Sequence, residues 1–185
     1  RTSNRHDYAL APFSKTALDS LKDAGLDVIG VGKIPDIFVD QGITRKIKTV
    51  SNEDGMNKTI ELASDNFNGL AFINLVDFDA VYGHRRNAAG YGKAIEEFDV
   101  QLGELINELK NDDLLMVTAD HGNDPTYRGT DHTREQVPLI IYSKQFNEMK
   151  VLNDGDSFGI IGSTICDNFN VKYNGIGSSI LELLK

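Results

Sequence analysis

Short apolar runs alternate along this chain with stretches of helical periodicity. Such runs, bounded by polar or glycine positions, are typical of buried strands, whereas apolar residues three and four positions apart indicate a helix packed on one face. The strands are predicted at residues 26–31, 70–76, 114–118 and 137–142. The helices are predicted at residues 14–24, 51–64, 90–110 and 157–168.

Two helix starts carry cap signals. Ser14 is a candidate N-cap of the first helix, and residues 51–54 resemble a capping box that opens the second. The third helix has the clearest apolar stripe, which predicts core packing rather than a cofactor site. That stripe consists of Ile95, Phe98, Leu102, Leu105, Ile106 and Leu109.

Continuous apolar strands separated by helices predict an α/β fold with a mainly parallel sheet sandwiched by helices. Residues 1–10 are polar and basic and lie outside this rhythm, so we expect them to be a linker or the end of another domain. Residues 11–185 then form the core.

Composition and charge narrow the class of protein. The 28 acidic and 19 basic side chains give a formal net charge of -9. That balance argues against nucleic acid or an anionic membrane as partner, because both attract clustered Lys and Arg. The single cysteine, Cys166, lies in an apolar stretch and is predicted to be a buried thiol. No signal peptide or membrane span is visible, so a cytoplasmic location is expected.

Histidines stand beside carboxylates at the ends of two predicted strands. Asp79 and His84 follow the second strand, and Asp120 and His121 follow the third, with His132 further on. The carboxyl ends of parallel strands meet at one edge of a sheet, so these side chains are expected to converge. Imidazole and carboxylate ligands suit Mn, Zn or Fe, with Mg possible where oxygen dominates. Five ligands exceed one tetrahedral site and suit two adjacent ions, which can clamp a phosphoryl group.

Each element also has a structural interpretation. A single histidine such as His84 is more often hydrogen-bonded than metal-bound. Residues 120–122 have the composition of a turn, and Asp79 is a possible helix cap. The joint occurrence of all three features at strand ends favours the metal site.

Longer motifs resemble phosphopentomutases, members of the alkaline phosphatase superfamily. Residues 118–126 (TADHGNDPT) and 129–138 (GTDHTREQVP) resemble the C-terminal signature of that family. Residues 74–79 (NLVDFD) with 83–86 (GHRR) resemble its other metal motif. The resemblance extends over nearly the whole chain.

The resemblance implies an alkaline-phosphatase-like core and a ligand set for two ions, typically manganese. Asp79, His84 and His132 would bind one ion, and Asp120 and His121 the second. The family's threonine nucleophile and a further metal-binding aspartate belong to an N-terminal part with no matching segment here. The core would thus be incomplete at its N-terminal side, and residues 1–10 would be the end of the family's cap domain.

Candidate substrate contacts are basic. The resemblance makes Arg1 a phosphate contact, and Lys33 follows the first predicted strand, near the expected site. Arg5 and His6 are equally well explained as a solvated basic segment. Arg85 and Arg86 are candidates to offset phosphate charge, with a solvent-exposed role expected for at least one.

The function implied is interconversion of ribose or deoxyribose 1-phosphate and 5-phosphate through a phosphoenzyme. Rival functions are a phosphoglycerate mutase or phosphatase of the same superfamily, or a non-catalytic metal-binding fragment. Without the threonine, the isolated chain is expected to bind one divalent ion weakly and to lack mutase activity.

Overall fold

The computed structural model describes residues 9–184. The chain divides into two compact units, and each is described by itself. The first unit comprises residues up to Lys48, Asn66–Asn74 and the residues from Met149 onwards. The second comprises Thr49–Asp65 and Leu75–Glu148. Among the described residues, no helix is long and apolar enough to cross a membrane.

The first unit is built on a parallel sheet of three strands. Its strands are β1 (Asp27–Val31), β2 (Arg45–Ile47) and β3 (Gly69–Ile73), in the order β2-β1-β3. Both neighbours run parallel to β1, with Ile29 opposite Arg45 on one side and Ala71 on the other. Four of the five β1 residues are buried, in keeping with the place of β1 between β2 and β3.

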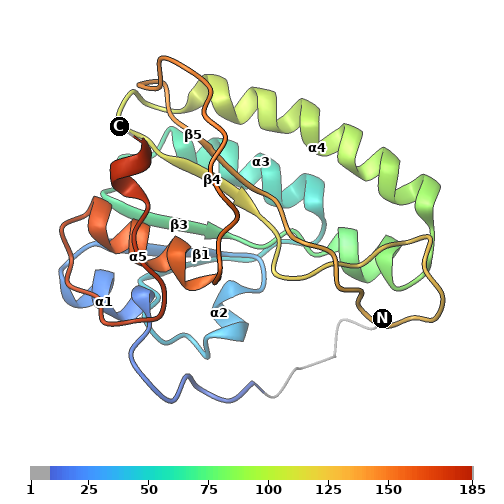
Figure 1. The fold of residues 1–185 in the computed structure, drawn as a ribbon, viewed down its shortest axis with the longest axis horizontal. Helices are drawn as coiled ribbons and strands as arrows, with labels where there is room; N and C mark the ends of the chain where they lie inside the picture. The colour runs from blue at the N-terminus through green and yellow to red at the C-terminus, as the bar shows by residue number, and fades with distance from the viewer. Residues whose placement is uncertain (1–8, 185) are drawn as a thin grey trace. The chain divides into compact units, whose positions relative to one another are not determined.

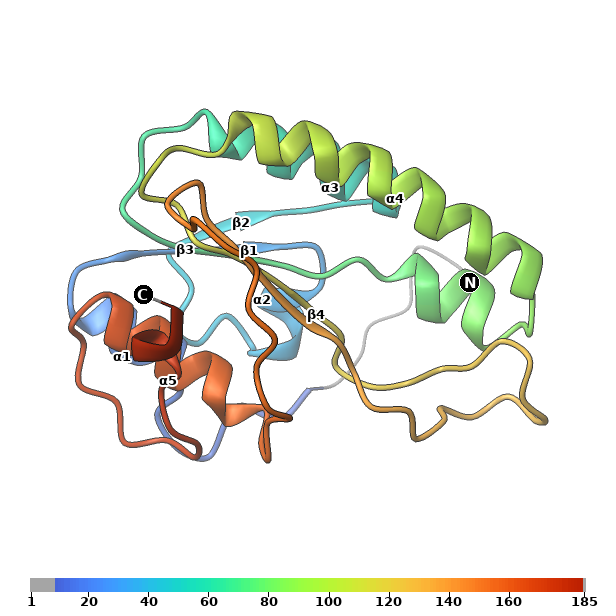
Figure 2. The same ribbon diagram turned by 45° about the horizontal axis from the view of Figure 1, so that its top comes forward.

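Helices complete the core of the first unit. They are α1 (Ala17–Asp23), the short α2 (Ile34–Ile37), α5 (Gly159–Asn168) and the 3₁₀ turn η2 (Leu181–Leu184). Helices α1 and α5 lie side by side (Figures 1 and 2). Buried apolar side chains of this core are Leu18, Leu21, Val28, Ile34, Ile43 and Cys166. The burial predicted for Cys166 is confirmed, and it raises the pKa of that thiol.

The second unit contains two helices packed side by side and a π-helical turn. They are α3 (Asn52–Ala63), α4 (Ala88–Glu108) and η1 (Phe78–Gly83) (Figure 1). Gln101 of α4 donates to Asn57 Oδ1 of α3 at 2.9 Å. Phe78 packs edge-on against Phe98 at 6.0 Å between ring centroids, which anchors η1 on α4.

Strands β4 (Leu115–Thr118) and β5 (Leu139–Tyr142) form an antiparallel pair in the second unit. The α/β class and the parallel sheet of the first unit are therefore confirmed, but this pair is antiparallel. Among the described residues, β3 pairs with β1, and β4 pairs with β5.

Caps and one stripe residue also differ from prediction. Thr16, rather than Ser14, caps α1, because Asp19 completes a reciprocal capping box with it. Ser51 caps α3 as predicted, but the Asp54 carboxylate accepts from the Val50 backbone N–H. In the α4 stripe, Ile95 is half exposed instead of buried.

Leu21→Ala tests the core of the first unit. Leu21 is fully buried, so we expect the variant to lose about 2–5 kcal/mol of unfolding free energy through lost burial and a residual cavity. Urea denaturation followed by circular dichroism measures the change. The matched control is Leu10→Ala, at a residue that is 93% exposed, where we expect a change within about 0.5 kcal/mol. Similar losses in both variants would contradict this description of the core.

Candidate metal centre

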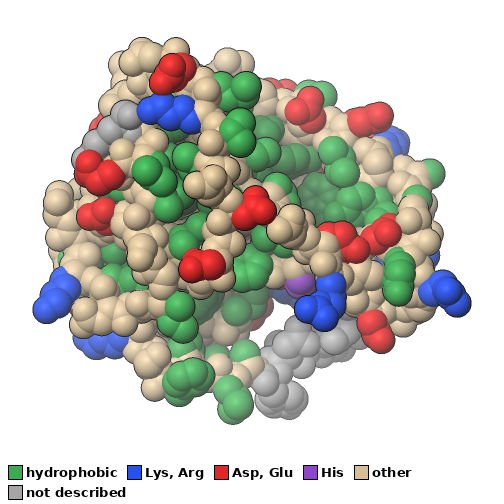
Figure 3. Space-filling model, in the orientation of Figure 1, with side chains coloured by type: hydrophobic (Ala, Val, Ile, Leu, Met, Phe, Trp, Pro, Cys, Tyr) green, Lys and Arg blue, Asp and Glu red, His purple; other side chains and the backbone are tan. Residues whose placement is uncertain are grey.

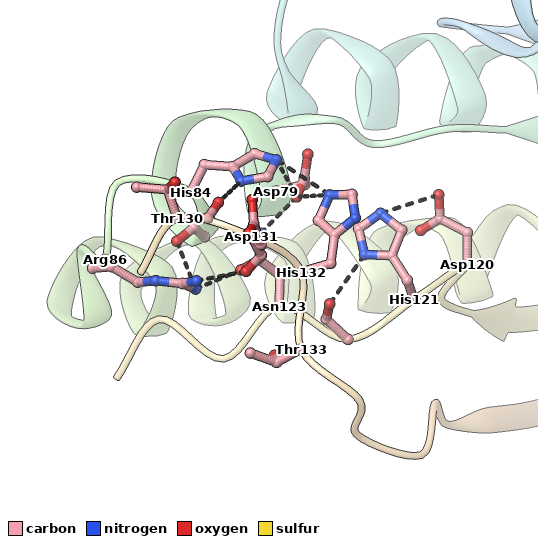
Figure 4. A network of polar contacts seen from close by, with 12 residues as sticks. Asp79, His84, Arg86, Asp120, His121, Asn123, Thr130, Asp131, His132 and Thr133 are labelled. Atoms are coloured by element: carbon pink, nitrogen blue, oxygen red, sulfur yellow. Dashed lines mark hydrogen bonds and ion pairs between the residues drawn. The ribbon is translucent and has the colours of Figure 1, made fainter. Parts of the chain in front are cut away.

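The five residues predicted as metal ligands all belong to the second unit, and Figure 4 shows them as one polar cluster. Asp79 lies within η1, and His84 follows that turn directly. Asp120 and His121 follow β4, and His132 belongs to the segment that leads to β5. The predicted convergence of these five side chains is therefore found.

The π-helical turn brings Asp79 and His84 together. The His84 backbone N–H donates to the Asp79 carbonyl at 3.0 Å, a bond that spans five residues. In an α-helix, residues five apart are rotated by about 140°. Bonding from i to i+5 widens the turn and brings them near one face, and such turns occur often at functional sites.

Three donor atoms converge at the centre of the cluster. Asp79 Oδ1 lies 3.3 Å from Nε2 of His84 and 3.3 Å from Nε2 of His132. The two Nε2 atoms lie 3.2 Å apart. Without a cation between these three atoms, one of the two nitrogens must donate a hydrogen bond to the other nitrogen or to the carboxylate oxygen.

These separations fit a shared metal ion. Ligands about 2.0–2.2 Å from a metal lie about 3.3–3.6 Å from one another at tetrahedral angles, and about 2.8–3.1 Å at right angles. The observed 3.2–3.3 Å falls within the combined span. Two imidazoles and a carboxylate also form a donor set suited to Mn, Zn or Fe.

His121 joins the same cluster. Its ring stacks on that of His132 with centroids 3.7 Å apart. Asp79, His121 and His132 each offer a ligand atom, and these atoms lie within 4.8 Å of one another. Asp120 Oδ2 lies 3.6 Å from His121 Nε2, and the Asp120 side chain is 75% exposed. A histidine is visible at the surface in Figure 3, in keeping with the partial exposure of these rings.

Backbone carbonyls occupy the other ring nitrogen of two histidines. His84 Nδ1 contacts the Thr130 carbonyl, and His121 Nδ1 lies 3.1 Å from the Gly122 carbonyl. A carbonyl only accepts hydrogen bonds, so each Nδ1 carries the proton in these contacts. Each Nε2 then points a lone pair toward the cluster, as in metal-binding histidines.

Arg86 ties together the segments that carry the ligands. Its guanidinium donates to the backbone carbonyls of Asp124 at 2.7 Å and Asp131 at 2.6 Å, and also to that of Gly129. A fourth acceptor, Asn123 Oδ1, lies at 2.7 Å. Arg86 therefore holds the segment before His132, and its guanidinium is engaged by protein acceptors. Of the two arginines, Arg85 is the one that takes the expected solvent-exposed role.

Hydrogen bonds to Thr133 and Asp124 hold the chain on either side of this segment. The Thr133 hydroxyl accepts from the Asp124 N–H at 2.6 Å and donates to Glu135 at 2.5 Å. Asp124 in turn accepts from the Thr126 hydroxyl and N–H, which lower its pKa. Its carboxylate is thereby engaged by its own turn.

Tyr91 stands beside the cluster and packs against Phe78 of η1 with centroids 5.7 Å apart. Burial raises the pKa of its hydroxyl, and the negative charges of Asp79 and Glu135 raise it further. The phenol therefore keeps its proton at neutral pH.

The two predicted substrate contacts are Lys33 and Arg1. Lys33 belongs to the first unit, where it immediately precedes α2. Arg1, like Arg5 and His6, lies outside the described residues.

Sequence reasoning missed two residues at the centre. The sequence pattern assigned no role to Asn123, although it directly follows residues 120–122, and it presented Arg86 as a group that offsets phosphate charge or faces solvent. In the sequence, Arg86 (in GHRR) and Asn123 (in DHGN) each stand close to a predicted ligand. The hydrogen bond between the two residues becomes visible only in the fold.

Comparison with known proteins identifies a family. The family model described as the metalloenzyme superfamily matches residues 1–173. The phosphopentomutases of Agathobacter rectalis and Clostridium botulinum are each 58% identical over 186 residues, covering 100% of this chain and 47% of the relative. The chain thus spans about half the length of these curated relatives.

The fold also resembles a solved structure. Leishmania mexicana phosphoglycerate mutase, studied in crystals at low cobalt concentration, superposes with a TM-score of 0.66. The match covers 91% of this chain and 39% of that protein, at 17% sequence identity. At that identity the likeness concerns the fold alone.

The contacts of the Arg86 guanidinium with residues 124, 129 and 131 act as a clamp on residues 124–131. Arg86→Lys tests this clamp. Lysine keeps the charge but loses the forked donors. If the lost contacts lower the free energy of local opening of residues 124–131 by about 1.4 kcal/mol, the fraction of molecules in which this segment is open rises about tenfold. Trypsin should then cleave the exposed Arg128–Gly129 bond about tenfold faster, because cleavage follows the open population. Mass spectrometry measures the rate. Arg85→Lys, at the adjacent exposed arginine, is the matched control, and equal cleavage of the two variants would contradict the clamp.

Proposed function

Because this chain belongs to the metalloenzyme superfamily, we propose that its histidine–aspartate cluster binds two divalent ions in a phosphopentomutase. The observation that carries the proposal is the convergence of Asp79, His84 and His132, whose ligand atoms are spaced as around one ion. The 58% identity to two phosphopentomutases across the full chain supports the choice of enzyme.

We assign the first ion to Asp79, His84 and His132, and the second to Asp120 and His121. Manganese is the proposed metal, because mixed imidazole and carboxylate ligands suit it and related enzymes typically use it. The stacked rings of His121 and His132 place the two ligand groups next to each other, which supports a pair of neighbouring ions. The exposed carboxylate of Asp120 leaves that side of the cluster accessible to a substrate.

The proposed reaction interconverts ribose or deoxyribose 1-phosphate and 5-phosphate. When bound, the metal ions would offset the negative charge of the transferring phosphoryl group and lower the pKa of the nucleophile. The carbonyl contacts of His84 and His121 at Nδ1 hold each ring so that Nε2 of the neutral imidazole faces the cluster. Arg86 keeps the segment before His132 in place.

Two further parts of the proposal rest on resemblance and sequence position. Arg1 and Lys33 are proposed substrate contacts, as basic groups that can bind phosphate. The threonine nucleophile is proposed to lie outside these 185 residues, so that the isolated chain binds metal without turning over substrate. A cytoplasmic location remains a prediction from the sequence.

A paired assay tests the function. The whole protein that carries this chain, loaded with Mn²⁺, should convert ribose 1-phosphate to ribose 5-phosphate, and the 185-residue chain alone should not. His132→Ala should reduce kcat/KM of the whole protein by at least about 100-fold, because even residues that only support metal ligands contribute 10- to 100-fold. Coupled detection of ribose 5-phosphate measures the rates.

Arg134→Ala is the control, at an exposed position two residues beyond His132, and should leave kcat/KM nearly unchanged. Turnover of phosphoglycerate in place of the pentose phosphate would assign a different substrate. Rapid turnover by the isolated chain would contradict the placement of the nucleophile.

A further inference from the structure

Asn123 has a buried side-chain amide, with only 8% of the residue exposed. Both ends of that amide are engaged. Its Nδ2 donates to Asp79 Oδ1 at 2.6 Å, and its Oδ1 accepts from Arg86 at 2.7 Å. The amide therefore connects a guanidinium to the carboxylate at the centre of the cluster, as Figure 4 shows.

The direction of this chain of hydrogen bonds is fixed by chemistry. A guanidinium only donates, so the Asn123 oxygen must face Arg86. The amide nitrogen must then face Asp79, whose carboxylate accepts. Arg86 also donates to the backbone carbonyls of Asp124 and Asp131, so its own position is determined by several contacts.

Gly83 provides the space for the amide. A Cβ at this buried glycine would lie 2.5 Å from Asn123 Nδ2 and 2.7 Å from its Cγ, closer than real Cβ atoms approach. Because the neighbour is a buried amide with both ends bonded, it could not move aside without breaking one of its contacts.

We propose that Asn123 is a positioning residue for the metal centre. Its amide, which Arg86 holds in place, sets the orientation of the Asp79 carboxylate. The inference rests on the proposed metal-binding function. Without the amide, the carboxylate could rotate, and Oδ1 would no longer be held 3.3 Å from both His84 and His132. Metal affinity should fall as the donor set loses its preorganised geometry.

Asn123→Ala in the purified chain tests the proposal through metal affinity, measured by isothermal titration with Mn²⁺. We expect the dissociation constant to rise by about 10- to 100-fold, the usual effect of removing a group that orients a ligand. The melting temperature in EDTA provides a second measurement, because a merely structural role would lower the stability of the metal-free chain and leave its affinity for metal unchanged.

Two further variants sharpen the result. Gly83→Ala keeps the Asn123 amide but introduces a Cβ that collides with it. This variant should therefore weaken Mn²⁺ binding, as Asn123→Ala does. Asn57→Ala is the matched control, since its amide oxygen accepts from Gln101 on the exposed surface and should leave the affinity unchanged.

The outcomes separate the two proposals. If the unmodified chain binds no Mn²⁺, the proposed function fails. If it binds, but Asn123→Ala binds equally well, the metal centre stands and the positioning role is overturned. A loss of affinity in Asn123→Ala alongside an unchanged Asn57→Ala supports the positioning role.

Discussion

The structure of the second unit depends on one constraint, the convergence of two imidazole nitrogens on a single carboxylate oxygen. Asp79 Oδ1 lies 3.3 Å from Nε2 of both His84 and His132, which lie 3.2 Å from each other. Such a cluster of donor atoms is unfavourable unless a proton or a cation is shared among them. The spacing suits a metal ion, and the neighbouring contacts keep lone pairs directed inward.

Much of the chain around the cluster has little regular secondary structure, so side chains provide its order. Between β4 and β5 the isolated bridge of Gly122 with Thr133 is the backbone pairing that the structure describes there. Arg86 and Thr133 add side-chain contacts to the backbone on either side of His132. Loops that carry functional groups are commonly fixed in this way by a rigid scaffold, here the packed pair α3 and α4 with η1 anchored through Phe78.

Periodicity was sufficient to predict the long elements and the strands of the core, because burial leaves a clear apolar pattern in them. It did not predict the three-residue strand β2 or the short helix α2, whose sequences are too short to show a period. The π-helical turn was also missed, because one extra residue per turn leaves no signal in composition. The antiparallel pairing of β4 with β5 was not predicted either, since an apolar run does not state the direction of the strand it pairs with.

The candidate site was more predictable than its supports. Histidine and aspartate at strand ends are unusual enough to be noticed, and the five predicted ligands do lie together. Asn123 and the clamp role of Arg86 depend on contacts between residues 37 positions apart, which no local pattern encodes. The residues that bind are thus visible in the sequence, whereas those that orient them emerge from the fold.

Anomalous diffraction from crystals of the chain grown with Mn²⁺ tests the central claim most directly. The account predicts a peak about 2.0–2.2 Å from the Asp79 carboxylate and from Nε2 of His84 and His132. Well-ordered crystals with these three side chains in contact and no peak between them would contradict it.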